Sequence, residues 1–160
     1  MKEYRVTKYD PALRGPNGEY RGDDWIMFSQ IGQSFGGVVL TEQEYARIEG
    51  NYINAALAFL SESGITGLRV KGLENPRRQS LTFVEGSVLT LDQIPVFMSR
   101  ILREEFWCRL EGDNAFVHFG WDYYMYVGVP HSCPAAEQTA AELGLYVEEF
   151  VSPYHEEPLN

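Results

Sequence analysis

Cys133 and His131 are the two side chains whose types and spacing come nearest to nucleophilic chemistry. Cys133 precedes Pro134 at the start of a predicted helix, where the helix dipole lowers the pKa of a thiol. A thiolate beside an imidazole can act as nucleophile and base. The sequence names no third side chain that would orient His131, and a Cys before Pro is also common at a simple helix entry. The pair is therefore a candidate for catalysis, with a structural helix entry as the alternative.

His118 and Asp122 form a second candidate pair for a small enzyme, because they lie four residues apart in an aromatic stretch. The spacings HxxxD and HxC do not match a closed zinc pattern, so we expect no metal site. The side chains that have the types of transition-metal ligands are His118, Asp122, His131, Cys133 and His155.

The strong signatures of nucleotide, hydrolase, metalloprotease and redox sites do not occur in the sequence. It contains no GxxxxGK[ST], GxGxxG, GxSxG, HExxH or CxxC pattern. We therefore expect no cofactor, and an enzyme is the less favoured class of protein.

The element that must position these residues is a predicted meander of three strands over residues 107–128. Asp113-Asn114 after Gly112 is a hairpin signal, because these residues tolerate positive φ. This turn pairs Leu110 with Val117. A second turn over residues 120–122 is expected to place Val117 opposite Met125.

The meander should have one apolar face toward the core and a second face that is rich in aromatic rings, because side chains alternate across a strand. A helix covering the second face is one expectation. The other is a binding surface for a partner, since Tyr, Trp and Arg anchor interfaces. The second face carries Trp107, Arg109, Glu111, Phe116, His118, Tyr124 and Tyr126.

The remaining pattern predicts an α+β fold with a mostly antiparallel sheet. Capping boxes at Thr41 and Thr90 begin two main helices, about 41–63 and 91–106, and Pro95 should distort the start of the second. A short helix is expected over about 134–143. At 160 residues the chain is interpreted as a single domain, 1–160. Other predicted elements are strands over 4–9, 66–73, 81–85 and 146–151, a long loop over 10–23 and a C-terminal tail over 152–160.

Charge is strongly uneven along the chain, whose net charge is −10. Residues 1–103 hold equal numbers of acidic and basic side chains, whereas residues 104–160 are acidic and hold a single basic side chain, Arg109. An acidic surface favours a basic protein partner and disfavours nucleic acid, whose phosphates need Lys and Arg. The alternative is that the protein is simply an acidic, soluble one.

Neither a signal peptide nor a run of about 18 apolar residues that could span a membrane occurs in the sequence. The two cysteines without a signal indicate free thiols in a reducing cytoplasm. We therefore expect a cytoplasmic protein that does not bind membranes.

The phrases YRVTKYDPALRGPNGEY, GDDWIMFSQIG and LEGDNAFVHFGWDYYMYVG resemble a family of small bacterial proteins without a characterised activity. Their general character is similar to that of the immunity proteins that neutralise polymorphic toxins. The resemblance implies a non-enzymatic inhibitor of a basic toxin or nuclease. The alternatives are a small enzyme and a homo-oligomeric subunit whose aromatic face is a homodimer seam. The predicted binding residues are Trp107, Glu111, Asp113, Phe116, His118, Trp121, Asp122, Tyr124 and Tyr126.

Overall fold

The computed structural model describes residues 1–156 of the chain. Its three α-helices are α1 (Glu42–Glu62), α2 (Ile94–Leu102) and α3 (Pro134–Glu142), and two 3₁₀ turns span Pro11–Leu13 and Phe28–Gln30. The strands are β1 (Lys2–Thr7), β2 (Ser34–Phe35), β3 (Val38–Val39), β4 (Gly67–Glu74), β5 (Val88–Thr90), β6 (Trp107–Glu111), β7 (Phe116–Phe119), β8 (Met125–Val129) and β9 (Tyr146–Glu149).

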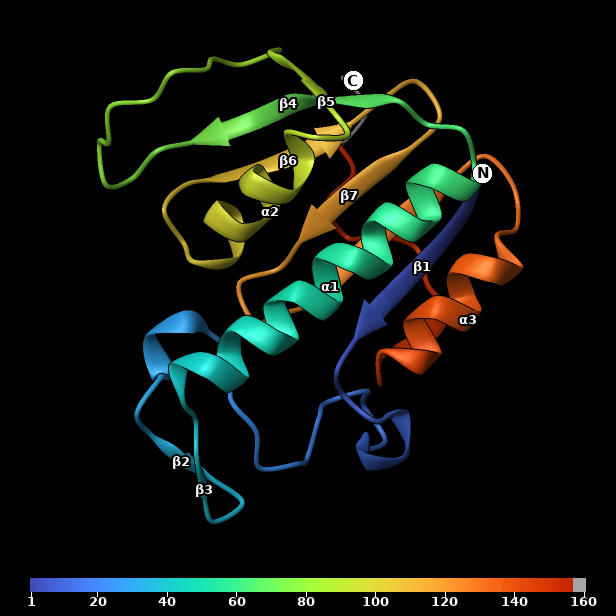
Figure 1. The fold of residues 1–160 in the computed structure, drawn as a ribbon. Coiled ribbons are helices and arrows are strands. Elements are labelled where there is room, and N and C mark those ends of the chain that lie inside the picture. Colours follow the sequence, from blue (N-terminus) through green and yellow to red (C-terminus); the bar gives the residue numbers. More distant parts are fainter. Residues whose placement is uncertain (157–160) are drawn as a thin grey trace.

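Seven of the strands form one sheet in the order β5-β4-β6-β7-β8-β1-β9 (Figure 1). Every neighbouring pair in this sheet is antiparallel. Strand β1 lies between β8 and β9. The first strand of the chain therefore pairs on both sides with strands from the C-terminal part of the sequence. The strands β2 and β3 form a separate hairpin.

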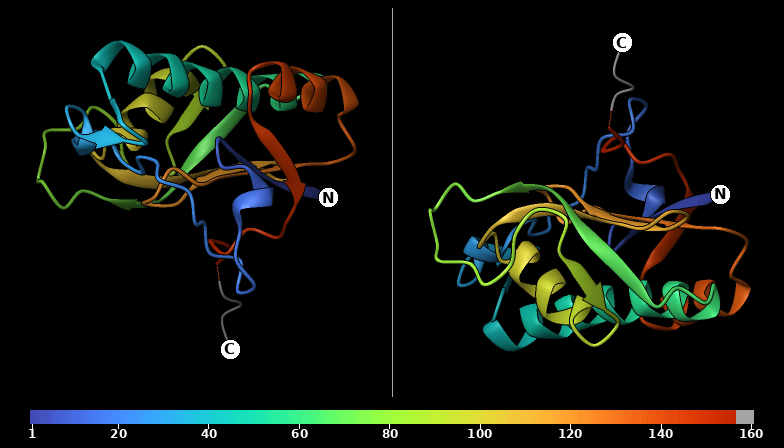
Figure 2. Two further views of the ribbon diagram at one scale, coloured as in Figure 1. Left: turned by 90° about the horizontal axis from the view of Figure 1, so that it is seen from below. Right: turned by 90° about the horizontal axis from the view of Figure 1, so that it is seen from above.

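The three helices all lie on one side of the sheet (Figure 2). The opposite side is approached by the loop that follows β1 and by the segment that follows β9 (Figure 2). The predicted α+β fold with a mostly antiparallel sheet is therefore confirmed.

None of the helices that the structure describes has both the length and the apolar character that crossing a membrane requires.

Helix α1 begins and packs as its sequence predicts. The Thr41 hydroxyl accepts a hydrogen bond from the Glu44 N–H at 3.1 Å, which satisfies one of the free donors of the first turn. Tyr45, Tyr52 and Phe59 lie on its buried side. Helix α2 begins only at Ile94, so that its proline occupies the first turn, where no helical N–H is lost.

The first turn of the meander has the predicted register, with Leu110 opposite Val117. The second register was wrong: Val117 lies opposite Val127, and Phe119 lies opposite Met125. The loop between these strands is therefore two residues longer than predicted. A shift by two leaves every side chain on its predicted face, because the side-chain period of a strand is two.

Three smaller predictions also need correction. Residues 81–85 do not form a strand, because Phe83 packs instead against the rings of Phe97 and Phe106. The hairpin of β2 and β3 was missed, although Gly36-Gly37 at its turn is a hairpin signal. Of the predicted tail, residues 152–156 pack against the sheet, and residues 157–160 lie outside the described part of the chain.

The aromatic face and its cover as a candidate functional site

The second face of the meander is buried, and the helices lie on the other side of the sheet. His118 is fully buried, and Trp107, Phe116 and Tyr126 are each less than a tenth exposed. The cover consists of residues 150–156, which we call the strap, together with part of the loop over 10–23. Both expectations for this face, a helical cover and an open surface, therefore need correction.

The strap is fixed to the sheet by a chain of three polar side chains. The Ser152 Oγ and the His118 Nδ1 are 2.7 Å apart, and the His118 Nε2 lies 2.9 Å from the Glu111 carboxylate. The Glu111 carboxylate can only accept, so the neutral His118 ring carries its hydrogen on Nε2 and donates a hydrogen bond to Glu111. Its Nδ1 then accepts from the Ser152 hydroxyl, whose oxygen also accepts from the Tyr154 N–H. Each hydrogen-bonding atom of the imidazole thus has a partner.

Burial lowers the pKa of His118 to about 3, and the nearby His155 and Arg109 act in the same direction. The imidazole is therefore neutral at physiological pH. The Glu111 carboxylate beside it is shared, since the Arg109 Nε lies 3.0 Å away. The Phe116 ring stacks on the imidazole with 4.1 Å between centroids, which fixes its plane.

Five further contacts hold the strap along its length. The Arg5 guanidinium lies 4.0 Å from the centre of the Phe150 ring. The Tyr154 ring packs against Trp107 and Tyr126, each at 5.8 Å. Glu156 forms an ion pair with Arg109, and the His155 Nε2 lies 2.6 Å from the Glu3 carboxylate.

The Ser152, His118 and Glu111 side chains have the residue types of a hydrolytic triad, but their setting does not suit hydrolysis. Ser152 is 4% exposed and His118 is not exposed at all. An imidazole whose pKa is near 3 is also a poor general base at neutral pH. The arrangement fits a structural clamp, in which a buried polar network is stable because every member is satisfied.

The structure does not assemble the predicted Cys133 and His131 pair. Cys133 is buried, and its thiol points toward the backbone oxygens of Phe59 and His131. Its pKa is raised by burial, the opposite of the direction that activates a thiol. The His131 side chain is exposed and its Nδ1 contacts the backbone oxygen of Ser132.

The second predicted enzyme pair is also separated. His118 is bonded to Glu111 and Ser152, while Asp122 lies in the loop beyond the end of β7. Burial raises the pKa of the Asp122 carboxyl. In residues 1–156, no three Cys, His, Asp or Glu side chains are placed to hold a metal ion together.

The predicted binding residues fall into four places. Trp107, Glu111, Phe116, His118 and Tyr126 lie under the strap. Tyr124 is covered by the loop over 10–23, since the Arg14 Nη1 donates to its hydroxyl at 2.7 Å. Asp113 is exposed at the turn between β6 and β7, whereas Trp121 and Asp122 lie at the other end of these strands, between β7 and β8.

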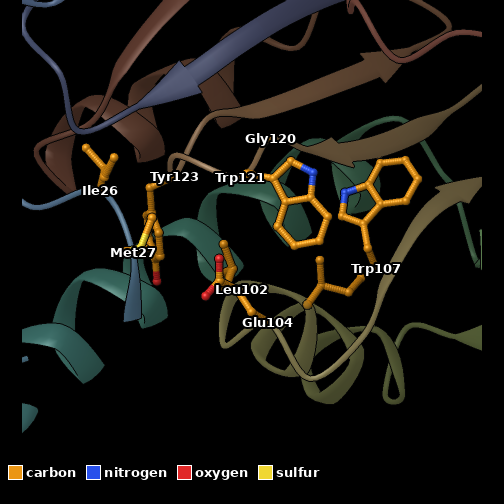
Figure 3. A pocket seen from close by; sticks show the side chains of 9 residues that line it. Ile26, Met27, Leu102, Glu104, Trp107, Gly120, Trp121 and Tyr123 are labelled. Atoms are coloured by element: carbon orange, nitrogen blue, oxygen red, sulfur yellow. The ribbon is translucent and has the colours of Figure 1, made fainter. Parts of the chain in front are cut away.

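A small hollow adjoins Trp121 at the second turn of the meander (Figure 3). Trp121 is 48% exposed, and the side chains of Ile26 and Met27 come to the same hollow from the segment before the first hairpin. Glu104, at the end of α2, contributes a carboxylate to its wall. Trp121 and Asp122 here, and Asp113 at the opposite end of the strands, are the exposed residues of the predicted site.

Two residues that line this hollow have an unfavourable backbone conformation. Glu104 and Tyr123 have φ angles of 60° and 65°, a left-handed region that costs a non-glycine residue about 1 kcal/mol or more. Tyr123 is retained there by its buried ring, whose hydroxyl donates to the Tyr45 hydroxyl at 2.9 Å.

No family model, curated protein or solved structure matches this chain in the comparisons. The fold class and the geometry of the site are therefore the basis for inferring a function.

The sequence reasoning missed Ser152 and Glu3 as parts of this region. Ser152 and Glu3 lie far from His118 in the sequence, and both are ordinary polar residues in segments without a motif. Arg14 gave a partial signal, because a cation in a Gly- and Pro-rich loop of an acidic protein is a candidate for contact with acidic side chains. The structure places it 3.6 Å from Glu148.

Proposed function

We propose that this protein is a non-enzymatic binding module of immunity type, which inhibits a basic partner protein such as a toxin or nuclease. The observation that carries the proposal is the half-exposed Trp121 beside the hollow formed with Ile26 and Met27. Tryptophan is among the residue types most enriched as interface anchors, and an exposed indole ring can fill a pocket on a partner.

The charges around this hollow support a basic partner. Glu104 lines it and Asp122 follows Trp121 directly. The neighbouring cations Arg100 and Arg103 are already paired with Glu105 and Glu49. The acidic groups would therefore attract a positively charged surface and raise the rate of association.

Further support comes from the side chains that carry reactive chemistry. Cys133 and His118 are both buried and bonded within the protein, so neither is presented to a substrate. An inhibitor needs a rigid surface and no reacting group of its own, and this is the kind of function the geometry favours.

The test starts with retention of proteins from an extract of the source organism at low and high salt, followed by reconstitution with the retained protein in pure form. The expected partner is basic, binds less tightly as salt rises and loses its own activity in the complex. Trp121→Ala should weaken binding by about 30-fold, the effect of removing an interface anchor. Val96→Ala, which truncates another exposed apolar side chain, is the matched control and should leave the affinity unchanged.

Two outcomes would overturn the proposal. One is a retained partner that is not basic. The other is a partner whose affinity falls equally in the Trp121→Ala and Val96→Ala variants, since an anchor at the hollow requires the two to differ.

A further inference from the structure

A second surface, at the β4–β5 edge of the sheet, carries a cluster of cations, with Glu85 and Glu111 beside it. Nine of the 13 Lys and Arg side chains form an ion pair with a carboxylate. Within residues 1–156 the other four have no such partner, and all four lie within ten residues of one another: Arg69, Lys71, Arg77 and Arg78.

Their position in the fold leaves them facing outward. Arg69 and Lys71 alternate with the buried Leu68 and Val70 on β4, so they project from the side of the sheet that has no helices. Arg77 and Arg78 are exposed in the loop after β4. Figure 1 shows this loop extending beyond the end of β4 and returning along the outer edge of the sheet to β5. We call these four cations the basic stripe.

The edge beside the stripe also exposes apolar side chains. Val88 on β5 is 59% exposed, and Val84 in the preceding loop is 69% exposed. Strand β5 is the last strand on this side of the sheet, so its outer backbone groups have no strand partner among the described residues. Strand edges of this kind accept an added extended segment.

We propose that the basic stripe and the β5 edge bind an extended acidic segment of a partner protein. Its carboxylates pair with Arg69, Lys71, Arg77 and Arg78, and its apolar side chains lie on Val84 and Val88. This surface is separate from the hollow at Trp121.

The structure contains a precedent for a carboxylate at this position. Arg109 lies directly opposite Lys71 in the paired strands, and it holds Glu156 of the strap. An acidic segment of the chain itself therefore already reaches the rim of the stripe.

An acidic polypeptide fits this surface better than a nucleic acid. Single-stranded nucleic acids need exposed aromatic rings on which bases stack. The exposed large side chains beside the stripe are valines. The exposed aromatic residues lie elsewhere, with Trp121 in the loop between β7 and β8, Tyr146 on β9 and Phe150 in the strap.

The test uses the full chain and fluorescence anisotropy with a labelled oligoglutamate peptide, at low and at physiological salt. The variants are Arg69→Gln with Lys71→Gln, and separately Arg77→Gln with Arg78→Gln. The matched control is Arg21→Gln with Arg47→Gln, which removes the same charge from exposed arginines that are already paired with Glu19 and Glu44. Each stripe variant should bind oligoglutamate about tenfold more weakly, and the control less than about twofold.

Three results would overturn the inference. The wild-type protein could fail to bind oligoglutamate at low salt, or the control could lose as much affinity as the stripe variants. A labelled single-stranded DNA of equal charge that binds more tightly than oligoglutamate would replace the acidic segment with a nucleic acid. Because all four side chains are on the surface, the variants should fold, and circular dichroism checks this.

Discussion

On the helix side of the sheet, Phe59 and Met98 are fully buried among apolar side chains, whereas on the strap side the equally buried His118 is bonded to Glu111 and Ser152. Apolar burial is non-directional and grows with the area removed from water. A buried polar network instead depends on each partner being present and in the correct protonation state. The helix side should therefore carry most of the stability, while the strap side should respond to pH and salt.

The largest expected effect is on the helix side. Phe59→Ala removes a buried ring that packs 5.2 Å from Tyr4, and it should lower the free energy of unfolding by about 3–5 kcal/mol. Phe150→Ala makes the same change in the strap, where the ring is 40% exposed, and should cost about 1 kcal/mol. Urea unfolding measures both, and equal losses would remove the contrast between the two sides.

The next effect is the dependence of stability on pH. The pKa of His118 is about 3 in the folded protein and 6.5 for an ordinary histidine, so the unfolded chain binds more protons between these values. The contribution of the neutral His118 to the free energy of unfolding is fully present above pH 6.5. It is lost as the pH falls below this value, by about 1.4 kcal/mol per pH unit. His118→Asn should flatten the fall in unfolding free energy between about pH 6.5 and 5.

The control for this prediction is His131→Asn, because His131 is exposed. Its variant should keep the wild-type slope. A His118→Asn protein with an unchanged slope would show that the clamp does not depend on a neutral imidazole.

The smallest expected effect concerns the ion pair between Glu156 and Arg109. Glu156→Gln should lower the free energy of unfolding by at most about 1 kcal/mol, because the Glu156 side chain is 72% exposed. Glu149→Gln breaks the pair between Lys2 and Glu149, whose side chain is as exposed as that of Glu156, and it should cost less, since Lys2 is far more exposed than Arg109. High salt should reduce both effects, and urea unfolding at two ionic strengths tests the order.

Local turn chemistry explains which parts of the meander could be predicted. Asp113-Asn114 defines its hairpin through residues that tolerate positive φ, and the register next to it is correct. The second turn contains Tyr123 with a φ of 65°, a conformation that nothing in its residue type indicates. It is imposed by burial of the ring among Tyr45, Tyr52 and Trp25, a tertiary effect.

The strap could not be predicted for a similar reason. Its residues carry no strand or helix period, and Ser152 is 34 positions from the histidine it meets. The pattern correctly indicated that the second face of the meander is rich in aromatic rings. It could not indicate the cover, because irregular segments are placed by their long-range partners and not by local propensity.

The insertion of β1 between β8 and β9 bears on how quickly the chain can fold. Lys2 lies opposite Val129, and Tyr4 lies opposite Glu149, so each neighbour of this strand comes from more than a hundred residues further along the chain. Sheets built from such distant pairings fold slowly, because loop-closure entropy is lost before the contacts that offset it are made. The hairpin of β6 and β7 joins neighbouring residues and can form early, whereas β1 stays unpaired until β8 and β9 are in place.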